Sequence, residues 1–231
     1  MLEIDVNDLD FGNLFDVELA FKNLPFVLEG LPMTIAVSFT AMAIGLLLGF
    51  FLALGRQSKN ILLRWPSRLY ISFMRGTPIL VFLFILYSGL PMVGIQFSGI
   101  TAAILGFGLN SAAYIAEINR ASLNSVSNGQ WESAKALGFN YWQTLTRVVT
   151  PQAVRIALPP LTNVFLDIVK ATSLAAVITV PELFQKAQIV GGRTFDPLTM
   201  YILIAFIYWP LCILISAFQE RLEKRFSRYV S

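Results

Sequence analysis

The chain has 231 residues, of which 56% are hydrophobic and only 13% are charged. A soluble domain usually carries about 25% charged residues, and burial in a water-soluble core does not account for so many long apolar runs in so short a chain. The net charge of +3 is not gathered into a basic patch interleaved with aromatic residues, so no nucleic-acid partner is expected.

The first segment, residues 1–22, is acidic and of mixed polarity. Its apolar residues recur at helical spacing, which predicts a short amphipathic helix on the membrane surface; they are Phe11, Leu14, Val17, Ala20 and Phe21. A cleavable signal peptide needs a basic start before its apolar stretch. We therefore expect the first long apolar helix to direct insertion and to stay in the mature protein.

Five stretches are long and apolar enough to cross a bilayer, whose hydrocarbon core of about 30 Å needs roughly 20 apolar residues per helix. They cover approximately residues 28–54, 69–90, 100–121, 158–180 and 198–218. Gly45 and Gly49 form a Gly-x-x-x-Gly pattern that predicts close helix packing. Pro159-Pro160 suits the first turn of the fourth span, and residues 181–197 are expected to form a polar loop. The prediction is one all-α, polytopic membrane domain over residues 23–231.

The orientation follows from the distribution of Lys and Arg, which are enriched on the cytoplasmic side. With the N-terminus outside, five spans place the C-terminus in the cytoplasm. The outside then carries Lys22, Lys186 and Arg193, whereas the cytoplasmic segments carry twelve basic residues. The twelve are Arg56, Lys59, Arg64, Arg68, Arg120, Lys135, Arg147, Arg155, Arg221, Lys224, Arg225 and Arg228.

A long polar segment, residues 122–151, separates the third and fourth spans and is predicted to face the cytoplasm. Trp131, Ala134 and Gly138 recur at helical spacing beside small residues, and Gly138 is a suitable helix stop. So short a helix is marginal by itself, so it should pack against something. The pattern leaves open whether this helix merely connects two spans or docks on a partner.

Polar residues also occur inside the apolar stretches. Asp167 and Asn163 lie four residues apart and share one helix face, and a charge at mid-bilayer costs about 2.5–3.5 kcal/mol on insertion scales. One interpretation is a substrate pathway, to which we also assign Thr34, Ser38, Arg75 and Thr77. The alternative is structural: Lys170 would neutralise Asp167, and the hydroxyls would bond their own backbone. Glu117 and Arg120 are more simply a structural pair or a gate.

The long loop resembles the EAA loop of ABC importer permeases. The matching residues are Glu132-Ser133-Ala134, then Gly138 and, after nine further residues, Val148-Val149-Thr150-Pro151. Ser133, Val148 and Thr150 stand where the family pattern has Ala, Ile and Leu.

Further segments resemble the polar amino-acid uptake branch of that family: Arg75-Gly76-Thr77-Pro78, Ala113-Tyr114-Ile115-Ala116-Glu117, Leu158-Pro159-Pro160-Leu161 with Asn163, and Lys170-Ala171-Thr172-Ser173-Leu174. Ala171 stands where the branch more often has Asp. Within the branch, the chain looks closest to L-cystine permeases, on the segments Tyr87-Ser88-Gly89-Leu90-Pro91, Val180-Pro181-Glu182-Leu183-Phe184 with Ala187-Gln188, and Arg193-Thr194 followed by Met200-Tyr201.

The resemblance implies a type I ABC importer transmembrane domain in a bacterial cytoplasmic (inner) membrane. It implies a dimer of ATPase subunits that bind ATP and Mg, a second permease copy (identical or a close paralogue), and an extracytoplasmic substrate-binding protein. The cytoplasmic loop would insert a coupling helix into the ATPase, using Gln130, Trp131, Glu132, Ser133, Ala134, Lys135 and Gly138. The chain has no Gly-x-x-x-x-Gly-Lys-[Ser/Thr] phosphate loop, so no cofactor and no catalytic residue is expected in it.

Alternatives remain open from the residues alone. The substrate could be another amino acid, such as a basic one, glutamine or glutamate. A self-sufficient ion-coupled carrier would be expected to show an internal repeat, which we do not find. A membrane enzyme is disfavoured because the chain has no His, a single Cys212 in an apolar run and no paired carboxylates. The same composition predicts no metal site.

Overall fold

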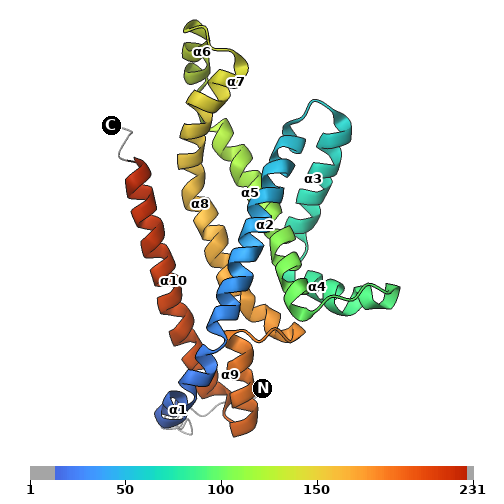
Figure 1. The fold of residues 1–231 in the computed structure, drawn as a ribbon, viewed down its shortest axis with the longest axis vertical. Helices are drawn as coiled ribbons and strands as arrows, with labels where there is room; N and C mark the ends of the chain where they lie inside the picture. The colour runs from blue at the N-terminus through green and yellow to red at the C-terminus, as the bar shows by residue number, and fades with distance from the viewer. Residues whose placement is uncertain (1–13, 228–231) are drawn as a thin grey trace, which may run out of the picture.

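The computed structural model describes residues 14–227, with side chains through Arg221, and this part of the chain contains helices and no strand. Four helical segments are long and apolar enough to cross a membrane. They are α2 (Leu31–Gln57), α5 (Gly99–Asn124), the run Tyr141–Ile178, and α10 (Pro197–Ser227). All four follow the long axis of the molecule (Figure 1). The predicted all-α, polytopic fold is therefore confirmed.

The fifth candidate span is broken, so the single span predicted over residues 69–90 is wrong in two respects. Helix α3 (Ile61–Gly76) begins eight residues earlier than predicted and includes Arg64 and Arg68. A bend of 105° then separates it from the segment Ile79–Val93, which consists of α4 (Ile79–Phe84), the π-turn η3 (Ile85–Gly89) and the 3-10 turn η4 (Leu90–Val93). Thr77 is extended because a residue before proline disfavours the helical region. Figure 1 shows α4 leaving the bundle sideways.

The segment after α5 is helical almost throughout. It comprises α6 (Asn128–Ala136), α7 (Tyr141–Thr144), the π-turn η5 (Leu145–Val149), α8 (Thr150–Ala171) and the 3-10 helix η6 (Thr172–Ile178). The prediction that Pro159-Pro160 begins this span is wrong, because both prolines lie inside α8. Their fixed φ is compatible with a helix at the expense of backbone hydrogen bonds, and Pro151 instead occupies the first turn.

The end of the molecule opposite α6 is built from α1 (Val17–Leu28) and α9 (Leu183–Thr194), as Figure 1 shows. Helix α9 stands where a polar loop was expected; its apolar residues Leu183, Ala187 and Val190 are buried together with Ala20 and Val27 of α1. Helix α1 covers only the last part of the predicted segment 1–22 and extends six residues beyond it. Residues 1–13 of that segment, including Phe11, lie outside the described residues.

The core is centred on the contact between α2 and α5, where glycines replace side chains. A Cβ atom at Gly49 would lie 2.7 Å from Ile115 Cγ2 and 2.9 Å from the Ala112 carbonyl oxygen. One at Gly108 would lie 2.9 Å from Ile44 Cγ2, and one at Gly45 would collide with Ser111 Oγ. The backbones of the two helices therefore approach closely, as the Gly-x-x-x-Gly pattern predicted.

A buried polar cluster joins three helices at the end where α9 lies. The Glu182 side chain, which is 0% exposed, accepts hydrogen bonds from Phe184 N (2.9 Å), Gln185 N (2.7 Å) and Tyr208 Oη (2.9 Å). Thr34 Oγ1 accepts from Leu183 N at 3.3 Å. The Glu182 carboxyl group, which caps α9, therefore links α9 to Tyr208 of α10, and the Thr34 hydroxyl links the first residue of α9 to α2.

We predict that Gly49→Ala lowers the free energy of unfolding by about 1–3 kcal/mol, because the added methyl group overpacks the α2–α5 contact. The measurement is thermal or denaturant unfolding of the purified protein in detergent. Gly192→Ala is the matched control, since nothing lies within 4 Å of the added atom in α9. Equal destabilisation by the two variants would contradict this account of the core.

We predict a pH-dependent contribution of Glu182 to stability. Burial raises the pKa of Glu182 above its ordinary value of 4.5, and its hydrogen bonds oppose that shift in part. A raised folded-state pKa gives stability that is full below pH 4.5 and is lost as the pH rises through the folded pKa. The melting temperature of Glu182→Gln, relative to that of the natural chain, should therefore rise from pH 4 to pH 7.

The control for this pH series is Glu18→Gln, which removes an exposed carboxylate from α1. Its melting temperature should run parallel to that of the natural chain across the same range. A Glu182→Gln difference that stays constant with pH would refute the buried, protonation-linked role of Glu182.

Candidate functional site

The helix predicted in the long loop is present. Helix α6 ends at Ala136, and Gly138 follows in the left-handed conformation with φ +81°. Gly138 N donates to the Lys135 carbonyl at 2.9 Å, and Phe139 N donates to the Ala134 carbonyl at 3.0 Å. Glycine adopts this conformation without the strain that a Cβ introduces, so Gly138 ends the helix as the sequence indicated.

One side of α6 is held by the rest of the chain. Ala134 is buried, and the Trp131 ring stacks on Tyr141 with centroids 5.7 Å apart. Gln130 Oε1 accepts from Gln152 Nε2 of α8 at 3.2 Å. These contacts fix α6 relative to the beginning of α8.

The other side of α6 is open. Glu132, Ser133 and Lys135 are exposed, and Glu132 makes no ion pair with any residue whose side chain the structure describes. Nearby, Leu137 is 77% exposed and Trp142 70% exposed. An exposed mixture of apolar, small and charged side chains at one end of the molecule is typical of a docking surface.

The open side of α6 is connected to the long helix α8 without a flexible loop. Asn140 and Gln143 form a reciprocal capping box at the start of α7, and the chain then continues as helix through η5 and α8 without a loop. A capping box satisfies two otherwise free backbone N–H groups. A displacement of α6 would therefore be transmitted along α8.

A pocket of about 260 Å³, with a mostly apolar lining, lies between α4, α5 and α8. Its polar lining residues are Asp167 of α8 and Asn110, Ser111 and Tyr114 of α5. The Asp167 side chain is 73% exposed and forms an ion pair with Lys170 at 2.8 Å. The predicted pair is thus present, and the carboxylate also lines the pocket.

Two more of the predicted pathway residues lie near this pocket. The Arg75 guanidinium lies over the Tyr114 ring, 5.6 Å from its centroid. Thr77 ends α3 just before Pro78. Asn163 is exposed one turn before Asp167 but is not among the residues that line the pocket.

Thr34 and Ser38 lie elsewhere. Both are fully buried on α2, beside a small cavity of about 90 Å³ shared with Phe165 and Leu211. Ser38 Oγ donates to the Thr34 carbonyl (2.7 Å) and Thr34 Oγ1 to the Gly30 carbonyl (3.3 Å). The structure does not bring these hydroxyls to the Asp167 pocket, so their contact with a substrate stays a prediction.

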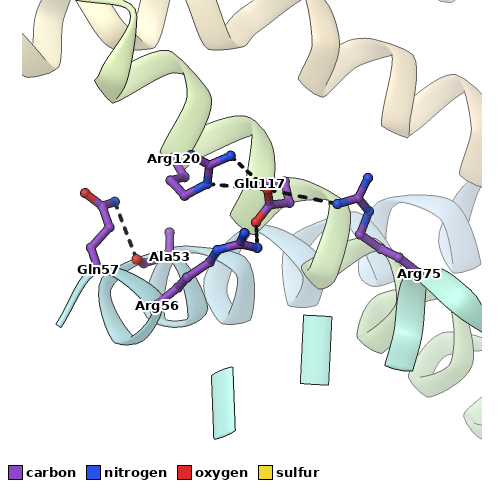
Figure 2. A network of polar contacts seen from close by, with 6 residues as sticks. All are labelled: Ala53, Arg56, Gln57, Arg75, Glu117 and Arg120. Carbon is purple, nitrogen blue, oxygen red and sulfur yellow. Dashed lines mark hydrogen bonds and ion pairs between the residues drawn. The ribbon is translucent and has the colours of Figure 1, made fainter. Parts of the chain in front are cut away.

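A charge cluster on α5 lies one turn beyond Tyr114. Glu117 pairs with Arg120 at 3.1 Å, as the sequence indicated, and also with Arg56 of α2 and Arg75 of α3, the last at 4.0 Å. Figure 2 shows the carboxylate surrounded by the three guanidinium groups. A single acidic side chain therefore connects α2, α3 and α5, and Arg75 connects this cluster to the Asp167 pocket.

Sequence reasoning missed several residues of the site. Asn110, Ser111 and Tyr114 were detectable as polar residues at i, i+1 and i+4 within an apolar stretch. Arg75 was predicted as a pathway residue, but the ion pairs of Glu117 with Arg56 and Arg75 carry no sequence signal, because these arginines come from other helices. Among the described residues, no group of three or more Asp, Glu, Cys or His side chains could hold a metal ion.

Comparisons with known proteins identify relatives over almost the whole chain. Residues 45–228 match the family described as "Binding-protein-dependent transport system inner membrane component". The chain is 56% identical to the probable amino-acid ABC transporter permease protein YckA of Bacillus subtilis (strain 168), over 97% of this chain and 100% of that protein.

Relatives with a named substrate are less similar. The L-cystine transport system permease protein TcyB of Bacillus subtilis (strain 168) is 43% identical, over 90% of this chain and 89% of that protein. The probable glutamine ABC transporter permease protein GlnM of the same organism is 34% identical, over 92% and 99%.

A solved structure shares the fold closely. It is the crystal structure of an amino acid ABC transporter with histidines, with a TM-score of 0.87 and 35% identity, over 91% of this chain and 98% of that chain.

Proposed function

Since this chain belongs to the family of binding-protein-dependent transport system inner membrane components and is a permease subunit of an amino-acid ABC transporter, we propose that it transports L-cystine. It is a transport component rather than an enzyme. The observation that favours cystine is the 43% identity to an L-cystine permease, against 34% for the glutamine relative.

In this proposal the substrate passes through the Asp167 pocket. L-Cystine carries two ammonium and two carboxylate groups, so it needs acidic and basic partners. Asp167 provides a carboxylate for an ammonium group, and Asn110 and Tyr114 provide neutral hydrogen-bonding groups. Arg75, over the Tyr114 ring, provides a cation for a carboxylate. The ion pair with Lys170 neutralises Asp167 while no substrate is bound.

In the same proposal α6 is the coupling helix. Its open side, with Glu132, Ser133 and Lys135, enters a cleft of the ATPase subunit, while Trp131 holds it against α7 and Gln130 holds it against α8. ATP with Mg binds to a dimer of that subunit and favours the outward-facing state, and hydrolysis resets it. A second permease copy, identical or a close paralogue, completes the pathway, and an extracytoplasmic protein delivers the substrate. The α6 end then faces the cytoplasm of a bacterial cell.

We predict that Asp167→Asn lowers uptake of L-cystine by the reconstituted transporter by roughly 10-fold or more, because a hydrogen bond to a charged group contributes about 1.5–3 kcal/mol. The measurement is uptake of labelled L-cystine into proteoliposomes loaded with ATP. Unlabelled L-cystine should compete with the label more strongly than unlabelled glutamine does.

The matched control is Lys170→Gln, which removes the same ion pair but keeps the Asp167 carboxylate. It should retain uptake if Asp167 binds substrate. Equal losses in both variants, or normal uptake by a fully assembled Asp167→Asn transporter, would return Asp167 to a structural role. Stronger competition by glutamine than by unlabelled L-cystine would refute the cystine assignment.

We predict that Glu132→Arg and Gly138→Asp each abolish co-purification of the ATPase subunit, the first by reversing charge on the open side of α6 and the second by straining its end. Gln188→Arg places an arginine at an exposed position of α9, at the opposite end of the molecule, and should leave co-purification intact. Normal ATPase binding and stimulation in both α6 variants would exclude the coupling role.

A further inference from the structure

Another pocket, of about 360 Å³, lies at the cytoplasmic end of α2, α3 and α5, apart from the Asp167 pocket. We call it the arginine pocket. All of its lining residues are polar: Arg56 and Gln57 from α2, Arg64 and Arg68 from α3, and Arg120 and Asn124 from α5. Figure 2 shows Arg56, Gln57 and Arg120 on neighbouring helices at this end.

The arginine pocket carries an excess of positive charge. Arg56 and Arg120 share the single carboxylate of Glu117 with Arg75. Arg64 and Arg68 form no ion pair with any acidic side chain that the structure describes. Arg56 is in addition repelled by Arg120, Arg68 and Arg75. An anion inside the pocket would relieve this repulsion.

The chemistry of the pocket selects phosphate. Guanidinium groups present planar pairs of N–H donors that match phosphate oxygens bidentately. The amide groups of Gln57 and Asn124 add neutral donors at the rim. Four arginines from three helices can surround one phosphodiester group in a way that lysines on an open surface cannot.

The surroundings of the pocket indicate where the phosphate comes from. Helix α3 also carries exposed apolar side chains at helical spacing, Leu62 (77% exposed), Trp65 (62%) and Leu69 (56%). The last turns of α2 carry exposed apolar side chains as well, including Phe51 and Leu54. Tryptophan is enriched where a helix meets the membrane–water interface. A soluble anion would gain nothing from these apolar surfaces, whereas acyl chains would cover them.

We propose that the arginine pocket binds the phosphate headgroup of an anionic glycerophospholipid of the cytoplasmic leaflet, whose acyl chains lie along α2 and α3. Basic pockets between transmembrane helices on the cytoplasmic side are suited to such headgroups. The bound lipid holds α2, α3 and α5 together at the end where, among the side chains that the structure describes, Glu117 is the acidic partner of their arginines. The side of the membrane rests on the orientation given by α6, but the site is independent of which amino acid is transported.

The test is native mass spectrometry of the purified permease–ATPase complex, titrated with phosphatidylglycerol or with phosphatidylcholine of the same acyl chains. The natural complex should retain phosphatidylglycerol preferentially. Arg64→Gln and Arg68→Gln should each weaken this binding about 10-fold, which corresponds to about 1.4 kcal/mol. Lys59→Gln removes a positive charge from the same cytoplasmic connection outside the pocket, and it should leave binding nearly unchanged.

The proposal is overturned if both lipids bind equally, or if phosphatidylglycerol binding survives in both arginine variants. Displacement of the lipid by millimolar inorganic phosphate would assign the pocket to a soluble anion instead. Loss of the ATPase subunit in Arg68→Gln with unchanged lipid binding would assign it to the protein partner. Unfolding curves of each variant exclude general misfolding, and if one arginine variant fails to fold, the other decides the result.

Discussion

The close approach of α2 and α5 is the constraint on which the rest of the structure depends. At Gly45, Gly49 and Gly108 the two helices leave no room for a β-carbon, so their relative position cannot vary without losing contacts. In a bilayer, packing of this kind replaces the hydrophobic effect as a source of helix association. Helix α5 is thereby fixed in position, and it carries both the Asn110–Tyr114 side of the Asp167 pocket and Glu117 with its ion pairs.

The fold could be predicted from the sequence where its determinants are local or compositional. The apolar stretches indicated the long helices, and the spacing around Trp131 with the glycine at 138 indicated α6 and its end. Prediction failed where two local signals compete. Thr77-Pro78 interrupts an otherwise continuous apolar run at the bend between α3 and α4. Pro159-Pro160 is a stronger helix-breaking signal, yet both prolines lie inside α8.

In the candidate site, too, contacts within one helix could be predicted, whereas contacts between helices could not. The pairs Asp167–Lys170 and Glu117–Arg120 could be predicted, because each pair is spaced along one helix. The pocket around Asp167 depends on α4 and α5, which sequence spacing does not place beside α8. Glu182 was read as part of a polar loop, because nothing in its immediate neighbourhood indicates that Tyr208, 26 residues away, donates to its carboxylate. Arg64 and Arg68 were predicted to lie in the segment before the second span, because no local signal indicates that α3 begins at Ile61.

The sharing of one carboxylate among Arg56, Arg75 and Arg120 has a consequence for motion. Three guanidinium groups offer more N–H donors than the oxygens of Glu117 can accept, so no single arrangement satisfies all of them. When one arginine withdraws, the carboxylate can bond more fully to the other two. Such an exchange of partners makes the energy of the cluster nearly insensitive to small shifts of α3 relative to the fixed pair of α2 and α5. This end of α3 can therefore slide during a transport cycle without passing through a state in which Glu117 is unpaired.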